Sequence, residues 1–179
     1  MNNRNRLFNS GLLVMQYAIN QPEPTEAEYE VLRQYIANGG RILLLCPAWV
    51  WTHYDKKPLD RLPYARIARN FGLLVETQYV KPPMKIVHPD FKVSNPEEIL
   101  NGTFSRTEYQ RDSTAVPIVE DKNGNASVVA ATRGNARIIV WGQNNLLSKK
   151  NANKKGAQEF VAKALDWLLA ESSEDIQAD

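Results

Sequence analysis

The chain has 179 residues, of which 22 are basic and 20 acidic, and its formal net charge is +2. Because the charges are balanced and no stripe of arginine and lysine is present, we predict no nucleic-acid partner. The single cysteine excludes an internal disulfide framework and any metal site built from several cysteines.

No segment has the pattern of a membrane anchor or a secretion signal. No apolar run reaches the roughly 18 residues of a transmembrane helix, and residues 1–10 contain no apolar h-region. The compartment stays open, because a secreted or periplasmic chain excised from a longer precursor would look the same. We expect one domain over residues 11–170, preceded by a disordered or linker segment at 1–10 and followed by an acidic tail at 171–179.

The first part of this domain has the pattern of a βαβ unit. Residues 11–19 form a continuous apolar run, which is typical of a strand buried on both faces. A helix is predicted from Thr25, whose spacing to Glu28 is that of a capping box, to the glycine pair at 39–40. A second apolar run at 41–49 follows. Strand, helix and strand in this order predict a parallel sheet in an α/β fold.

The remaining predicted elements are shorter, apart from the last. A short helix over 63–72 leads to a strand-like run at 73–80. An irregular stretch follows, with a small helix near 95–101. Residues 127–142 contain two strands joined by a Gly-Asn turn, which indicates a hairpin. Residues 157–172 have the apolar spacing of an amphipathic helix.

Several of these strings resemble a known superfamily. "PTEAEYEVLRQYIANGGRILLL", "GNARIIVWGQNN" and "FVAKALDWLL" resemble the class I glutamine amidotransferase-like superfamily, in branches that lack amidotransferase activity. These branches are the ThuA-like domains and the domains attached to mucin-degrading metallopeptidases and ABC-transporter accessory proteins. "CPAWVW" followed by "LPYARIARNFGLLVE" is most similar to the peptidase-associated branch.

The resemblance implies a flavodoxin-like three-layer sandwich with a mainly parallel central sheet and a C-terminal helix. It also implies that Cys46 stands where the amidotransferase nucleophile would stand, at the carboxyl end of a central strand.

Cys46 lacks the neighbours that a nucleophile needs. In a strand-to-helix elbow the next residue donates its backbone N–H to the oxyanion, and here that residue is Pro47, which has no N–H. The resemblance implies a His-x-Glu pair after the late strand, but Gln143 stands there, and an amide accepts no proton. We therefore interpret Cys46 as a buried structural residue. Catalysis by its thiolate with His53 or His88 as the base is the alternative.

The two histidines form no metal motif. His53 and His88 have Asp55 and Asp90 close by in the sequence, but no His-x-x-His or similar spacing is present. We therefore predict no metal site. The glycines also lack a phosphate-cradling pattern, so no nucleotide and no other cofactor is predicted.

Aromatic and polar residues follow the second predicted strand. Open α/β sheets bind ligands beyond the carboxyl ends of their strands, so we predict a ligand-binding surface there. Flat rings beside a carboxylate and an imidazole suit a sugar or a protein partner, and the alternative is that the tryptophans pack beneath the loop. The late "GQNN" string should reach the same edge. The predicted ligand-binding residues are Trp49, Trp51, His53, Tyr54, Asp55, Gln143, Asn144 and Asn145.

Three functions follow from these patterns. The first is a non-catalytic, amidotransferase-like domain, a pseudoenzyme, that binds a carbohydrate or a protein partner at the carboxyl edge of its sheet. The second is a hydrolase or isomerase that acts on a small sugar-like or amide substrate through Cys46 with His53 or His88. The third is a structural or oligomerising domain of a larger protein. A homo-oligomer of this chain is one form that such a domain could take.

Overall fold

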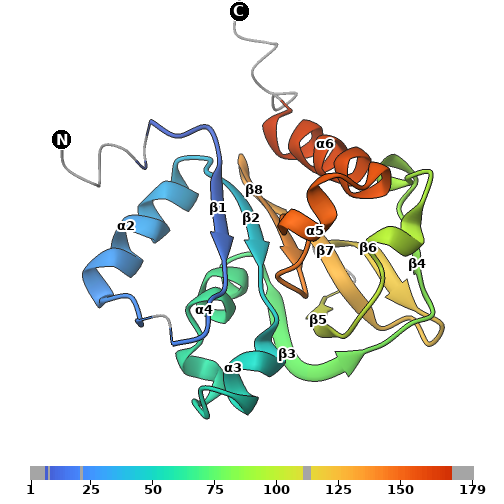
Figure 1. The fold of residues 1–179 in the computed structure, drawn as a ribbon. Coiled ribbons are helices and arrows are strands. Elements are labelled where there is room, and N and C mark those ends of the chain that lie inside the picture. Colours follow the sequence, from blue (N-terminus) through green and yellow to red (C-terminus); the bar gives the residue numbers. More distant parts are fainter. Residues whose placement is uncertain (1–6, 8, 21, 111–113, 171–179) are drawn as a thin grey trace, which may run out of the picture.

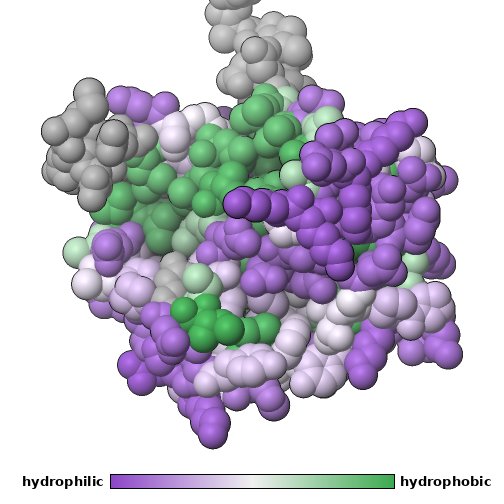
Figure 2. Space-filling view, viewed as in Figure 1, coloured by the Kyte–Doolittle hydropathy of each residue, from purple (hydrophilic) through white to green (hydrophobic). Residues whose placement is uncertain are grey.

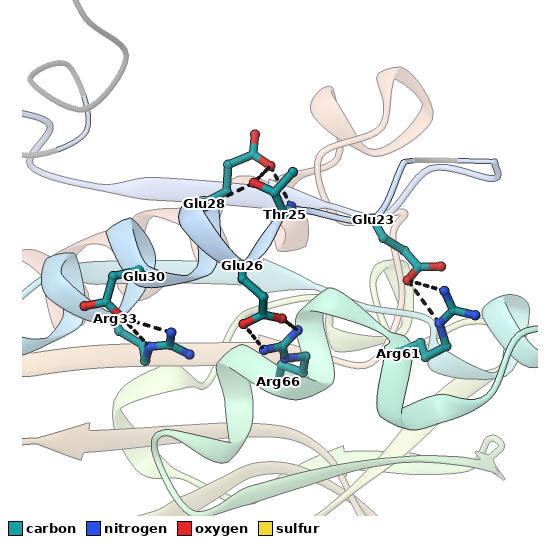
Figure 3. Close-up of polar contacts among 8 residues, drawn as sticks. All are labelled: Glu23, Thr25, Glu26, Glu28, Glu30, Arg33, Arg61 and Arg66. Atoms are coloured by element: carbon teal, nitrogen blue, oxygen red, sulfur yellow. Dashed lines mark hydrogen bonds and ion pairs between the residues drawn. The ribbon is translucent and has the colours of Figure 1, made fainter.

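The computed structural model describes residues 7, 9–20, 22–110 and 114–170 (Figure 1). The predicted βαβ unit is confirmed, because β1 (Leu13–Gln16) and β2 (Arg41–Leu45) pair in parallel and α2 (Glu26–Ala37) joins them. The predicted capping box is also present. The Thr25 N–H donates to Glu28 Oε2 at 2.8 Å, and the Thr25 hydroxyl accepts the Glu28 N–H at 3.3 Å (Figure 3).

The elements after β2 are short helices, strands and single 3-10 turns. In chain order they are α3 (Ala48–His53), η1 (Leu59–Arg61), α4 (Pro63–Arg69), β3 (Leu73–Val80), β4 (Met84–Ile86), η2 (Pro89–Phe91), η3 (Pro96–Glu98), β5 (Phe104–Tyr109), β6 (Val116–Asp121), β7 (Ala126–Arg133), β8 (Ala136–Trp141), α5 (Lys149–Ala152) and α6 (Lys155–Leu169).

The predicted flavodoxin-like sandwich with a mainly parallel sheet is wrong. The main sheet has six strands in the order β1-β2-β8-β7-β6-β4, and only the pairs β1–β2 and β2–β8 are parallel. The pairs β8–β7, β7–β6 and β6–β4 are antiparallel. The predicted hairpin is confirmed, with Arg133 opposite Ala136 across the turn. This turn reverses the chain, so the sheet beyond β8 cannot continue in parallel.

The strand-like run at 73–80 does not join the main sheet. It is β3, which pairs antiparallel with β5 in a separate two-stranded sheet. Its first residues alternate between buried and exposed, as in a strand with one face in solvent. An apolar run predicts that a strand forms, but it carries no information about the direction of its partner.

Alternate residues of the central strands pack into two hydrophobic cores, one on each face of the sheet. Ile42 and Leu44 contribute to one core, and Leu43 and Leu45 to the other. Helices α2 and α4 cover the first face and α6 covers the second (Figure 1). The side chains that the helices bury include Tyr35, Ile36, Ile67 and Ala68 on the first face and Phe160, Ala164 and Leu168 on the second.

β1 is an edge strand with apolar side chains on its outer surface. Val14 is 44% exposed, and apolar residues continue from β1 toward the end of α6, where Leu169 is 51% exposed (Figure 2). An exposed edge strand offers unpaired backbone groups to another chain. The homo-oligomer stays a prediction.

No helix within the described residues is both long and apolar enough to cross a membrane. The acidic tail at 171–179 lies outside the described residues, as do positions 1–6 and 8 of the predicted linker.

Gly40 permits the tight passage from α2 into β2, and its replacement should destabilise the fold. The Tyr35 hydroxyl donates to the Arg41 carbonyl at 3.0 Å and accepts the Arg41 N–H at 3.1 Å, which holds the ring against Gly40. A Cβ at Gly40 would overlap this ring and the Tyr35 carbonyl oxygen. We expect Gly40→Ala to lower the free energy of unfolding by about 2–3 kcal/mol, as overpacking does.

The matched control is Gly11→Ala, since an added Cβ there meets nothing within 4 Å. Its free energy of unfolding should be unchanged or slightly raised. Urea denaturation of both variants measures the difference, and equal destabilisation would show that Gly40 is not tightly packed.

Candidate functional site

Cys46 follows β2 directly and is completely buried. Its backbone N–H donates to the Trp141 carbonyl at 2.8 Å, and the residue is 0% exposed. Burial raises the pKa of the Cys46 thiol far above its ordinary value. At neutral pH the sulfur is therefore a protonated thiol inside the core, whereas a nucleophile needs an accessible thiolate.

Pro47 begins a short helix here instead of a nucleophile elbow. It is the N-cap of α3, and the Ala48 N–H, the first after the proline, donates to the Cys46 carbonyl at 3.0 Å. The N–H groups next to Cys46 are thus either absent or already used. Neither Pro47 nor Ala48 therefore offers an oxyanion donor.

The two histidines lie apart, and neither is hydrogen-bonded to Cys46 within the described part of the chain. His53 is exposed at the end of α3, with its ring 4.8 Å from the Tyr54 ring. His88 caps the turn η2, where its Nδ1 accepts the Asp90 N–H at 3.4 Å. The neighbouring Phe91 belongs to the core under α6, and Cys46 belongs to the opposite core. The described residues contain no group of three or more His, Cys, Asp or Glu that could hold a metal ion.

Trp51 and Asp55 stabilise the segment after α3, Trp51 by a hydrogen bond to Pro58 and Asp55 by one to Tyr17 at the end of β1. Trp51 is 1% exposed, and its indole N–H donates to the Pro58 carbonyl at 3.0 Å. Asp55 accepts the Tyr17 hydroxyl at 2.8 Å. Trp51 therefore packs beneath the loop, and its ring presents no surface to a ligand.

The other aromatic residues of this region gather around a hollow. The half-buried Trp49 has its ring 5.7 Å from Tyr79, at an interplanar angle of 81°, and 6.2 Å from Tyr54. Tyr79 and Tyr54 are 53% and 57% exposed. A hollow of about 810 Å³ opens beside Trp49 and Tyr79, and we call it the aromatic hollow. Its polar lining includes Thr52, Thr77, Gln78, Lys81, Lys122 and Asn123.

Three elements meet at the aromatic hollow: α3, the end of β3 and the turn between β6 and β7. The turn is held by Asp121, whose carboxylate accepts the N–H groups of Asn123 at 2.8 Å and Asn125 at 2.9 Å. Burial opposes ionisation of Asp121, but these bonds and one from the Asn125 side chain outweigh it and hold the carboxyl pKa below its ordinary value. Asp121 is thus occupied with the turn, and the lysines supply the unengaged charge.

The "GQNN" segment lies next to this site but does not line the aromatic hollow. The Gln143 side chain donates to the Thr103 carbonyl at 3.2 Å, and the exposed Asn144 uses its carbonyl to accept the Gln16 amide at 2.9 Å. Gln143 Oε1 and Asn145 Oδ1 are buried without a hydrogen-bond partner among the described residues. The segment therefore makes backbone and amide contacts with Thr103 and Gln16, and it contributes no side chain to the hollow.

The structure brings together a different set from the one that the sequence predicts. Trp49 lines the aromatic hollow, and Tyr54 with His53 stands beside it. Sequence reasoning missed Tyr79 and Lys81, because only the pairing of β3 with β5 carries them to α3. The one available signal was the polar string Glu76-Thr77-Gln78 followed by Tyr79 at the end of the strand-like run at 73–80.

The fold and the site define a mixed α/β domain with an aromatic hollow at one end of its sheet. No family model matches the chain, and no curated protein matches it. The mmIFT52 N-terminal domain is similar in structure, with a TM-score of 0.64, 18% sequence identity and coverage of 94% of this chain and 81% of that domain.

A cytoplasmic protein from Salmonella typhimurium is also similar, with a TM-score of 0.59, 11% identity and coverage of 92% of this chain and 74% of that protein. At these identities the similarity shows the fold alone. Nothing in the comparisons points to the amidotransferase-like superfamily.

The state of the Cys46 thiol can be measured directly. We expect iodoacetamide at neutral pH to leave Cys46 unmodified in the folded protein, because the thiol is buried and its pKa is raised. The same reagent should modify it fully in guanidinium chloride. Mass spectrometry measures both, and rapid alkylation of the native chain would restore the nucleophile hypothesis.

The two neighbouring aromatic residues Trp51 and Tyr54 should differ in their effect on stability. We expect Trp51→Ala to lower the free energy of unfolding by about 3–5 kcal/mol, since it empties a core site. Tyr54→Ala should change it by no more than about 0.5 kcal/mol, since its side chain is largely in solvent. Chemical denaturation separates the two, and a mild effect of Trp51→Ala would place that ring outside the core.

Proposed function

We propose that this chain is a non-catalytic binding domain whose aromatic hollow takes an oligosaccharide. The observation that carries the proposal is the corner formed by the perpendicular rings of Trp49 and Tyr79 beside the hollow. Sugar rings present flat C–H faces that pack on aromatic rings, and their hydroxyls need hydrogen-bonding groups around the edge.

The lining supplies both kinds of contact. The Thr52 hydroxyl and the side-chain amides of Gln78 and Asn123 can each donate or accept, as sugar hydroxyls require. The Lys81 ammonium lies 5.7 Å from the Tyr79 ring centroid, so a charged donor stands next to the aromatic surface. A volume of about 810 Å³ lies within the range of about 300–1,000 Å³ that is usual for ligand sites.

The burial of Cys46 supports the non-catalytic part of the proposal. A hydrolase or isomerase acting through this thiol would need a base within hydrogen-bond reach, and neither His53 nor His88 provides one in the described structure. The groups around the aromatic hollow are suited to binding, because its one carboxylate, Asp121, is engaged by its own turn and the rest of the lining supplies aromatic rings, hydroxyls, amides and ammonium groups.

A protein partner at the same edge is the second candidate. Tyr54 is 57% exposed and its ring lies 4.8 Å from that of the exposed His53, outside the lining of the hollow. Exposed tyrosines of this kind often form the energetic centre of a protein interface. The two candidates therefore depend on different residues.

Tyr79→Ala tests the oligosaccharide proposal. A glycan array identifies the glycan that binds best, and titration calorimetry measures its affinity for each variant. We expect Tyr79→Ala to weaken binding by about tenfold, equivalent to about 1.4 kcal/mol, through the loss of one stacking face. Leu74→Ala is the control, since Leu74 is 49% exposed on the same strand but does not line the hollow.

Absence of any glycan ligand, or equal affinity of the Tyr79→Ala and Leu74→Ala variants, would contradict the proposal. A captured protein whose binding is lost in Tyr54→Ala but kept in Tyr79→Ala would support the second candidate instead.

A further inference from the structure

A second concave surface lies at the other end of β7. This strand begins next to the β6–β7 turn of the aromatic hollow and ends at the Gly134-Asn135 turn, so the two surfaces are separated by its whole length. Two hollows of about 330 and 480 Å³ meet there between α2, α4 and the β7–β8 turn. They share Arg33, Ile36, Asn70 and Arg133, and we call them together the arginine groove.

The arginine groove is lined by cations without acids. Arg33, Arg66, Arg69 and Arg133 line it, and no Asp or Glu does. Two of the four are paired outside the groove: Arg33 with Glu30 at 2.9 Å, and Arg66 with Glu26 at 2.8 and 3.1 Å (Figure 3).

The other two arginines have no carboxylate partner within the described residues. Arg133 donates only to the Asn70 backbone carbonyl, at 2.9 Å. The Arg69 side chain is exposed and has neither an ion pair nor a hydrogen bond among the described residues, while its backbone carbonyl accepts the Gly72 N–H at 3.1 Å. The groove thus holds two guanidinium groups that are not paired with a carboxylate of the described residues.

The floor of the groove is apolar. Ile36 and Ile67 are 4% and 1% exposed, and the partly buried Leu32 lies beside them. The Arg66 guanidinium stacks on the Tyr29 ring with 3.5 Å to the centroid, which fixes one wall. An apolar floor under a cationic rim favours a chain segment that carries both acidic and apolar side chains over a simple anion.

We propose that the arginine groove binds an acidic peptide segment of a partner protein. Carboxylates of the segment would meet Arg69 and Arg133, whose planar groups pair with carboxylates in bidentate geometry. An apolar side chain of the segment would cover Ile36 and Ile67. Charge complementarity identifies the occupant, and the proposal is independent of the oligosaccharide proposal for the aromatic hollow.

The test is fluorescence anisotropy with a fluorescein-labelled synthetic octapeptide, Glu-Leu-Glu-Glu-Leu-Glu-Asp-Leu. We expect it to bind the full chain, more weakly as salt rises, and we expect the same peptide with Gln and Asn for its acids not to bind. Arg69→Glu with Arg133→Glu should weaken binding by more than about tenfold. Arg69→Glu alone should weaken it severalfold without affecting the fold, because this exposed side chain has no hydrogen bond or ion pair to lose among the described residues.

The matched control is Lys85→Glu with Lys150→Glu, which makes the same change in net charge. Both lysines are exposed and neither lines the groove. Equal loss of affinity in the control would show that only overall charge matters and would overturn the proposal. Equal binding of the acidic and amide peptides would overturn it as well.

Two further experiments test whether the arginine groove has a different occupant. Inorganic phosphate that displaces the peptide at equal concentration would make the groove a general anion site and not a peptide site. The acidic tail of this chain is tested by replacing Glu171, Glu174, Asp175 and Asp179 together with their amides. A marked gain in peptide affinity would identify the tail as the occupant and overturn the assignment to a partner, and unchanged affinity would support it.

Discussion

A backbone hydrogen bond of Gly142 joins the two sheets, and the position of the aromatic hollow depends on it. The Gly142 N–H donates to the Ser127 carbonyl at 2.9 Å, and its carbonyl accepts the Ser105 N–H at 2.8 Å. A Cβ at Gly142 would overlap the Ser105 and Ser127 carbonyl oxygens, so no larger residue fits between these strands. Because Ser105 also accepts the Trp49 N–H at 3.2 Å, this crossing places α3 against β3 and creates the aromatic hollow.

The residue that first suggests chemistry has a structural task. Cys46 lies at the end of a buried strand, where related geometries place nucleophiles, yet the core around it keeps the thiol neutral and closed to solvent. Its small size suits the point where β2 turns into α3, since Pro47 and Ala48 are packed immediately behind it. A strand end provides a location for catalysis, but activation depends on a base and on oxyanion donors, which the described residues around Cys46 do not supply.

The balanced charge of the chain conceals an uneven distribution. Glu30 and Glu26 of α2 pair with Arg33 and Arg66, two of the arginines that line the groove, but neither carboxylate is part of the lining, whose charged residues are all cations (Figure 3). At the other end of β7 the carboxylate of Asp121 is engaged by its own turn, so the aromatic hollow presents amides, hydroxyls and lysines. The two surfaces thus differ in chemistry, one aromatic and one cationic, and they lie on different elements.

The sequence by itself determined the local elements: the capping box at Thr25, the βαβ unit, the Gly-Asn hairpin and the C-terminal helix all follow from patterns within a few residues. It also marked Trp49 and Tyr54 as residues near a strand end. Only the tertiary structure decided that β3 leaves the main sheet, that Trp51 is buried and that Tyr79 meets Trp49. The physical reason is that strand direction and partner choice are set by hydrogen bonds and packing between segments far apart in the chain, and a local apolar pattern carries no record of them.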